Sequence, residues 1–265
     1  MNFSQGPRNA GLDYFGAVQS CYDYFWENGI NTDIIDCDFS LDKYKLVIVP
    51  MLYMFRGGIG EKLREFVRSG GTLVTTCFSG VVDENDLCFL GEATEEKISD
   101  VLGLWVEEID ALYDGEFNYT EYNGKRYELK NLCEVIRPVS CKTLSVYEKD
   151  FYKNSPVITE NVFGKGKAYH IGSCAGTDLY KDFFGKITEE LGLERAMNIE
   201  VPQNVSLSYR VSEKGKYVFV QNYGEDSVEI LLDKEYFKAS DGERIADKIV
   251  LNGFDGVVLF DERSM

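Results

Sequence analysis

The segment TCFSGVVDENDLCFLG, residues 76–91, places a thiol, a hydroxyl and three carboxyls close together after an apolar run. Cys77 would be a nucleophile if a base lay beside it, and His170, the one histidine of the sequence, is the candidate base. Neither Cys77 nor Ser79 has the small neighbours of a nucleophile elbow. A single histidine in a predicted strand is more often structural than catalytic. A cysteine hydrolase or amidotransferase-like enzyme using Cys77 and His170 therefore stays an alternative.

The acidic residues Asp83, Glu84 and Asp86 of the same segment suggest two kinds of chemistry. Paired carboxyls can hydrolyse glycosides or bind a metal ion. Carboxyls crowded into a polar segment are more often a solvated loop, because like charges repel unless they are paired. Apolar residues on both sides of the acids predict that this loop is fixed in place, and fixed loops often carry sites. We expect no metal site here.

A glycine cluster, RGGIGEKLREF at residues 56–66, precedes a predicted helix, where a phosphate group would bind. The glycine spacing does not match G-x-G-x-x-G, and no Walker lysine follows in register. We interpret the cluster as a loop and expect no nucleotide or other cofactor.

The composition excludes several classes of partner. A formal net charge of −17 argues against nucleic acid, since phosphate binding needs a basic patch. The sequence contains neither an apolar run long enough to span a membrane nor a secretory signal, which indicates a cytoplasmic protein. The seven cysteines are odd in number, lack a CxxC pair and fit reduced thiols, and they are Cys21, Cys37, Cys77, Cys88, Cys133, Cys141 and Cys174.

The first part of the chain has the pattern of an α/β protein. Apolar residues at helical spacing predict a helix over 11–28, and an amphipathic pattern predicts another over 60–71. Short apolar runs predict strands over 32–36, 44–50 and 72–78. The alternation of strands and helices favours an open, mostly parallel sheet.

The pattern changes after Gly103. Alternating residues with an Asn-Gly turn predict a hairpin over 116–129, and a second hairpin is predicted over 155–173. A helix is predicted over 178–191. From Val201 onward, short alternating strands indicate a small antiparallel β-sandwich. We therefore predict two domains, an α/β domain over residues 1–200 and an all-β domain over 201–265.

Two motifs resemble the middle, trimerisation domain of the family 42 β-galactosidases. The first ends a predicted strand in P-M-L-Y, and the second reads F-S-G-x-x-D-E-N-D-x-x-x-L-G. The hairpin FGKGKAYHIG and the final all-β segment also resemble that family, so the resemblance covers nearly the whole chain. The motif residues are Pro50, Met51, Leu52, Tyr53, Phe78, Ser79, Gly80, Asp83, Glu84, Asn85, Asp86, Leu90 and Gly91.

The resemblance implies a fold, an oligomeric state and a catalytic barrel that this chain lacks. It implies a flavodoxin-like sheet, similar to class I glutamine amidotransferases, with helices on both faces. It implies a homotrimer formed through this domain. Members of the family hydrolyse terminal β-galactosides with two glutamates on a (β/α)8 barrel, and this chain lacks that barrel. We therefore assign no catalytic residue and expect the chain to be inactive alone, with itself and the missing barrel as its partners.

The resemblance also changes the interpretation of the acidic loop. We predict that the loop contacts a neighbouring subunit or forms the rim of its sugar site, through Phe78, Ser79, Gly80, Asp83, Glu84, Asn85 and Asp86. A third alternative is a carbohydrate-binding module in the all-β part, which would use Tyr209, Tyr217 and Tyr223. Tyrosines at strand spacing are more often packing residues.

Overall fold

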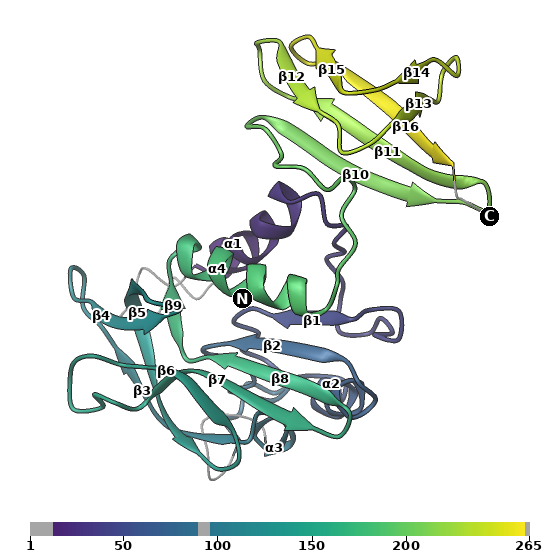
Figure 1. The fold of residues 1–265 in the computed structure, drawn as a ribbon. Coiled ribbons are helices and arrows are strands. Elements are labelled where there is room, and N and C mark those ends of the chain that lie inside the picture. Colours follow the sequence, from purple (N-terminus) through teal and green to yellow (C-terminus); the bar gives the residue numbers. More distant parts are fainter. Residues whose placement is uncertain (1–12, 90–95, 263–265) are drawn as a thin grey trace. The chain divides into compact units, whose positions relative to one another are not determined.

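The protein divides into two compact units (Figure 1). The structure is a computed structural model that describes residues 13–89 and 96–262. Unit 1 comprises residues up to Cys21 together with 35–183, and unit 2 comprises 22–34 together with 184–265. Helices α1 (Tyr14–Glu27) and α4 (Thr177–Glu190) each supply residues to both units.

A five-stranded mixed sheet forms the centre of unit 1. Three of its strands are parallel, β1 with β2 and β2 with β8, and the other two pair antiparallel. Every residue of β2 is buried, as expected for a strand in the middle of a sheet that is covered on both faces. The strand order is β1 (Leu46–Val49), β2 (Thr72–Thr76), β8 (Gly166–Ile171), β7 (Pro156–Phe163) and β6 (Lys142–Val146).

Two helices, α2 (Ile59–Arg68) and α3 (Glu96–Leu102), contribute to the main core of unit 1. The apolar residues Ile59, Leu63 and Val67 recur every four positions along α2, so they share one face of the helix and are buried. They join Leu73 of β2 and other strand residues in the core cluster. The helix therefore covers one face of the central sheet because its sequence is amphipathic.

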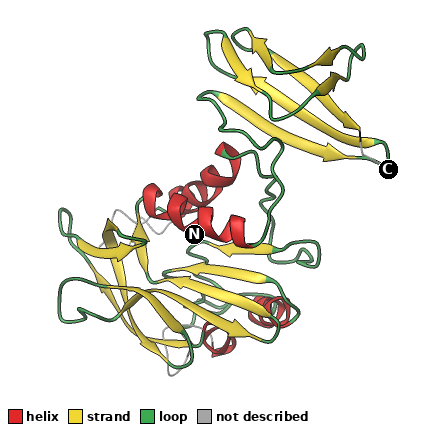
Figure 2. Cartoon of the chain, viewed as in Figure 1, coloured by secondary structure: helices red, strands yellow, loops and turns green. Residues whose placement is uncertain are grey.

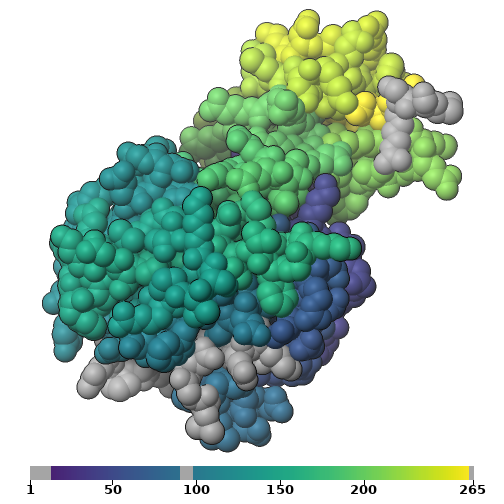
Figure 3. Space-filling model, turned by 60° about the horizontal axis from the view of Figure 1, so that its bottom comes forward, coloured from purple at the N-terminus to yellow at the C-terminus, as the bar shows by residue number. Residues whose placement is uncertain are grey.

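A second, antiparallel sheet completes unit 1. Strand β5 (Lys125–Pro138) lies between β3 (Leu104–Ala111) and β4 (Asn118–Tyr122), and β9 (Ser173–Ala175) also pairs with β5. The β4–β5 hairpin turns at Asn123 and Gly124, which both have positive φ, as the Asn-Gly dipeptide predicts. Residues 104–138 form part of the surface of unit 1 and are drawn in teal in Figure 3.

The helix-rich flavodoxin-like, or class I glutamine amidotransferase-like, open sheet that we predicted is wrong. Strands outnumber helices by sixteen to four among the described residues, and most strands pair antiparallel (Figure 2). The chain between β2 and β8 forms hairpins and meandering strands instead of further strand–helix units. Residues 32–36, a predicted strand, have no regular structure. Residues 104–111, which we did not predict, form β3.

Unit 2 consists mainly of antiparallel strands. The first sheet has the order β10 (Val205–Val211), β11 (Gly215–Asn222), β16 (Gly256–Glu262), β13 (Tyr236–Lys238) and β14 (Arg244–Ile245). A two-stranded sheet pairs β12 (Val228–Leu231) with β15 (Lys248–Leu251). Both sheets contribute to one apolar cluster that includes Val218, Val220, Ile230 and Leu259.

Candidate functional site

Three strands from the two sheets of unit 1 bring together a buried polar network. Strand β2 supplies Thr75, β8 supplies His170 and β5 supplies Glu134. The imidazole Nδ1 of His170 lies 2.7 Å from Oγ1 of Thr75, and its Nε2 lies 2.7 Å from Oε2 of Glu134. The side chains of His170 and Glu134 are only 3% and 1% exposed. Both ring nitrogens are therefore engaged away from water.

Glu134 also holds the start of the acidic loop. Its Oε1 accepts a hydrogen bond of 2.7 Å from the backbone N–H of Phe78. Phe78 has a φ of 62°, in the left-handed region that a bulky residue rarely adopts. The other carboxyl oxygen of Glu134, Oε2, lies against Nε2 of His170, so one side chain contacts both the strand residue and the loop backbone. The network therefore links three strands to a strained loop residue.

The predicted Cys77–His170 dyad is not formed. His170 already uses one ring nitrogen for Thr75 and the other for Glu134, which leaves no nitrogen to take the proton of a thiol. Cys77 is fully buried, and a hydrogen bond with Cys174 together with burial raises the pKa of its thiol well above the usual range. A raised pKa disfavours the thiolate that would act as nucleophile. The prediction of a cysteine hydrolase or amidotransferase-like enzyme is therefore wrong for this site.

The base of the acidic loop is tied to the chain that follows β1. The backbone N–H groups of Gly80 and Val81 donate to the carbonyls of Leu52 and Tyr53, each at 2.8 Å. The hydroxyl of Ser79 donates to the carbonyl of Val49 at 3.3 Å. Gly80 has a φ of 70°, and an added Cβ would lie 3.3 Å from the ring of Phe55. These contacts explain why the P-M-L-Y and F-S-G motifs occur together: they are two sides of one packed corner.

The tip of the loop, residues 83–86, lies in water. The carboxylate of Asp83 accepts backbone N–H groups from Asn85 at 2.8 Å and Leu87 at 3.0 Å, and these bonds lower the pKa of the Asp83 side chain. Glu84, Asn85 and Asp86 are exposed. Leu90 and Gly91, the last two motif residues, lie outside the described residues. The side chain of Asp83 thus stabilises the turn in which it lies.

The sequence analysis missed Glu134 as a member of this region. The signal for it is a single acid within the apolar run LCEVI, residues 132–136, since a buried carboxyl needs partners. No group of three or more metal-binding side chains occurs in the part of the chain that the structure describes. The buried network of Thr75, His170 and Glu134 therefore positions the start of the loop.

Each of the three tyrosines of the carbohydrate-binding alternative lies against another side chain. A lysine ammonium lies 4.2 Å from the centre of the Tyr209 ring. The rings of Tyr217 and Phe260 are 4.9 Å apart, and those of Tyr223 and Trp26 are 5.4 Å apart. These contacts are those of packing residues, as tyrosines at strand spacing often are.

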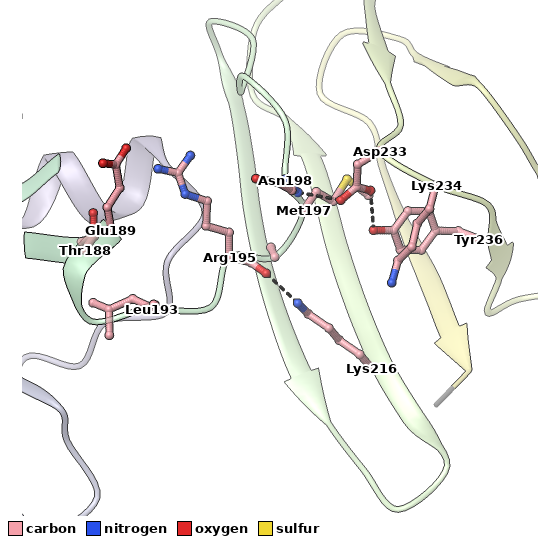
Figure 4. A pocket seen from close by; sticks show the side chains of 12 residues that line it. Thr188, Glu189, Leu193, Arg195, Met197, Asn198, Lys216, Asp233, Lys234 and Tyr236 are labelled. Atoms are coloured by element: carbon pink, nitrogen blue, oxygen red, sulfur yellow. Dashed lines mark hydrogen bonds between the residues drawn. The ribbon is translucent and has the colours of Figure 1, made fainter. Parts of the chain in front are cut away.

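Unit 2 contains a pocket of about 480 Å³ between residues 188–198 and the strands (Figure 4). Its polar groups largely bind one another. The Lys216 ammonium donates to the carbonyl of Arg195 at 2.6 Å and pairs with Glu194 at 2.7 Å. The carboxylate of Asp233 accepts the Tyr236 hydroxyl at 2.8 Å and a backbone N–H at 2.7 Å. We assign no ligand to this pocket because these groups already have partners.

None of the helices within the described residues is long and apolar enough to cross a membrane.

Comparison with known proteins decides the family. Residues 1–194 match the family described as "Beta-galactosidase trimerisation domain". The chain belongs to the β-galactosidase trimerisation domain family. The β-galactosidase Pbg of Clostridium perfringens is 41% identical to it over 264 residues, which is 96% of this chain and 38% of the relative.

Solved structures agree with this family. A catalytic mutant of Gan42B, a family 42 β-galactosidase from G. stearothermophilus, matches with a TM-score of 0.91 and 34% identity over 98% of this chain and 38% of that one. A cold-adapted β-galactosidase from Rahnella sp. R3 matches with a TM-score of 0.88 and 37% identity over 99% of this chain and 39% of that one. The trimerisation-domain chain thus spans less than two fifths of the length of these relatives.

Proposed function

We propose that this chain is the non-catalytic oligomerisation region of a β-galactosidase, and that a catalytic domain outside these residues hydrolyses terminal β-galactosides. The match of residues 1–194 to the trimerisation domain family is the observation that carries the proposal. The resemblance implies that the two catalytic glutamates belong to a (β/α)8 barrel. This chain then acts by assembling subunits, and it acts in the cytoplasm.

The chemistry of unit 1 supports a structural role. A retaining glycosidase needs two carboxyls about 5 to 5.5 Å apart beside a sugar pocket. Glu134 is buried and held by His170 and the backbone of Phe78. Asp83 binds its own loop backbone. The hydrogen bonds of Glu134 and Asp83 thus stabilise the local fold of the loop.

We propose that the assembly is a homotrimer with the acidic loop at one of its contacts. A cyclic trimer buries two different patches of each subunit against each other. Unit 1 exposes large apolar side chains that such patches would cover. Of the predicted contact residues, Glu84, Asn85 and Asp86 are exposed and Asp83 is partly exposed, whereas Ser79 and Gly80 are buried at the base of the loop. The exposed side chains are Phe15, Phe39, Leu87, Tyr113 and Phe151.

We keep the predicted division into a trimerisation domain over 1–200 and a β domain over 201–265 as part of the proposal. The compact units also separate the chain at 183/184. Residues Ala196 and Met197 pack in the apolar cluster of unit 2. Residues 1–200 and residues 1–183 can be expressed as two separate fragments. The fragment that folds and self-associates shows where the trimerisation domain ends.

The mass in solution tests the assembly. Sedimentation equilibrium across a wide range of concentrations should show a species of three times the 30.1 kDa chain mass. The chain should not hydrolyse a nitrophenyl β-galactoside. A strict monomer at every concentration would contradict self-association, and turnover that purifies with the chain would contradict the non-catalytic role.

A charge-matched pair of variants tests the loop. Asp83→Ala with Asp86→Ala should weaken association if the tip lies in the contact. Glu213→Ala with Asp226→Ala removes two exposed acids from unit 2 and should leave association unchanged. Equal association constants for the two variants would remove the loop from the interface.

A further inference from the structure

Two cysteines of unit 1 have their sulfur atoms in contact. Sγ of Cys77 lies 3.6 Å from Sγ of Cys174. Among the cysteines of the described residues, this is the one pair with a recorded sulfur–sulfur contact. A disulfide has an S–S length of about 2.05 Å, so the two sulfur atoms need to approach by roughly 1.5 Å. Side-chain rotation can supply a movement of that size.

The backbone already holds the two residues side by side. Cys77 follows β2 and donates its N–H to the carbonyl of Ile171 at 2.8 Å. Cys174 lies in β9, three residues after Ile171, and pairs with Lys130 of β5. Both cysteines also belong to one small apolar cluster with Met51. Closing the disulfide therefore requires no new folding of the main chain.

A third thiol, Cys133, is close by but is used differently. Its Sγ lies 3.5 Å from Oγ of Ser173. Burial raises the pKa of the Cys133 thiol to about 11. Cys133 pairs with Ser173 across β5 and β9. The structure thus favours Cys77 over Cys133 as the partner of Cys174.

We propose that Cys77 and Cys174 form a redox-active pair, which a hydroperoxide converts to an intramolecular disulfide. Cys174 is partly exposed and Cys77 is fully buried, so the peroxide meets Cys174 first. The Cys174 thiolate attacks one peroxide oxygen, the O–O bond breaks, and the leaving oxygen departs as water or an alcohol after taking a proton. Cys174 is then a sulfenic acid.

The second step joins the two residues. The Cys77 sulfur attacks the Cys174 sulfur, the S–S bond forms, and the S–O bond of the sulfenic acid breaks. The departing hydroxide takes the thiol proton of Cys77 and leaves as water. Overall two thiols are oxidised by two electrons and one hydroperoxide is reduced by two.

The disulfide would fasten the base of the acidic loop. Cys77 directly precedes Phe78, whose N–H is bound by Glu134, and Cys174 lies just before α4. The bond closes a ring of nearly one hundred residues, and long rings restrict the unfolded chain strongly. The melting temperature of unit 1 should therefore rise by about 5 to 10 °C on oxidation and return on reduction.

The thiol chemistry also predicts a pH dependence. The hydrogen bond with Cys174 and burial raise the pKa of Cys77, so little thiolate is present at neutral pH. Disulfide formation should accelerate as the pH rises, because the fraction of Cys77 thiolate increases with pH.

Peroxide oxidation of the whole chain tests the pair. The protein is treated with a small excess of hydrogen peroxide, free thiols are alkylated, and peptides are mapped by mass spectrometry. We expect a Cys77–Cys174 peptide that is lighter by two hydrogen atoms, loss of two of the seven thiols, and recovery with dithiothreitol. Cys77→Ala and Cys174→Ser should each abolish the crosslink, whereas Cys133→Ser and Cys88→Ser should retain it.

Other outcomes would overturn the proposal. A Cys133–Cys174 crosslink, or one between two chains through the exposed Cys88, would assign the oxidation elsewhere. Overoxidation of Cys174 without a crosslink in the wild-type protein would show that Cys77 does not reach it. Circular dichroism of each variant confirms that it is folded, and Cys77→Ser serves as a second variant if Cys77→Ala is not.

Discussion

Unit 1 contains a buried acidic residue, Glu134, and a group of acidic residues at the loop tip, and the two are stabilised in different ways. Glu134 is excluded from water, and its two oxygens are bound by His170 and by the backbone of Phe78. Asp83 at the loop tip remains in water and binds the backbone of its own turn. In a low-dielectric interior a missing partner is costly, whereas water replaces a missing partner at the surface.

The difference shows where function and stability can separate. The buried acid is fixed by folding, so its replacement should damage the chain whether or not it assembles. The acids of the tip make only local hydrogen bonds beside water, so we expect a large effect of replacing them only if a partner covers them. Variants of the two groups therefore test different properties of the same corner.

The largest effect is expected from Glu134→Ala. This change removes the carboxyl that bonds the N–H of Phe78 and Nε2 of His170, and it creates a cavity. We expect a loss of about 3–5 kcal/mol in the free energy of unfolding of unit 1. Urea unfolding followed by tryptophan fluorescence measures it, with Trp26→Phe in every variant so that Trp105 reports unit 1 alone. A loss below about 1 kcal/mol would show that the network is not structural.

The next largest effect is the coupling between Glu134 and His170. In a double-mutant cycle of Glu134→Ala and His170→Ala, the two losses should not add, because each single change removes the same hydrogen bond. We expect a coupling free energy of about 1–3 kcal/mol. The pair Asp83→Ala and His170→Ala is the control, and it should be additive. Additive losses in both cycles would indicate that the 2.7 Å contact contributes nothing specific.

The sequence predicted the elements that depend on neighbouring residues better than those that depend on pairing between distant segments. Local patterns correctly predicted α2, α4 and both hairpins, since helix periodicity and an Asn-Gly turn are properties of neighbouring residues. The flavodoxin-like sheet was wrong because sheet order depends on pairings between distant segments, such as β2 with β8. Strand β3 was missed, although it pairs along most of its length with β5.

The site was predicted in part for the same reason. The sequence pattern indicated Cys77, His170 and the acidic loop as candidate functional residues. The register of β2 with β8 brings Cys77 and His170 to the same region of the sheet. That register also places Thr75 opposite His170, and β5 brings in Glu134, so the histidine is fully occupied. An isolated acid in LCEVI indicates burial, but its partners are set by strand pairing that the sequence pattern does not reveal.

An intermediate effect is expected at Gly80, which connects the buried and exposed groups. Alanine at its φ of 70° is strained and meets the ring of Phe55 at 3.3 Å. We expect a loss of about 1–2 kcal/mol. Gly124→Ala is the matched control, because Gly124 has a φ of 76° and nothing lies within 4 Å of an added Cβ. Equal losses would mean that strain alone matters, and a larger loss at Gly80 would show that the corner is tightly packed.

The smallest effect on the folded chain is expected from Asp83→Ala. The two backbone hydrogen bonds lower the folded-state pKa of Asp83, so its stabilising contribution is fully present above the unfolded pKa of about 3.9 and is lost as pH falls through the lower folded value. The melting temperature should fall by only about 1–2 °C at pH 7, and the difference from wild type should shrink as the pH falls below the unfolded pKa. Asp83→Asn, which keeps an acceptor oxygen, should remain closer to wild type at pH 7.

The dependence of the Asp83→Ala melting temperature on protein concentration shows whether a second subunit covers the loop tip. In a monomeric chain the difference between Asp83→Ala and wild type is independent of concentration. If a second subunit covers the tip, the difference should grow with concentration, because association stabilises only the wild-type contact. Melting temperatures measured over a hundredfold range of concentration, for Asp83→Ala and for the control Asp226→Ala, separate the two cases. A difference that stays constant while wild type associates would leave the tip outside the interface, and the two acidic groups would then differ only in their exposure to water.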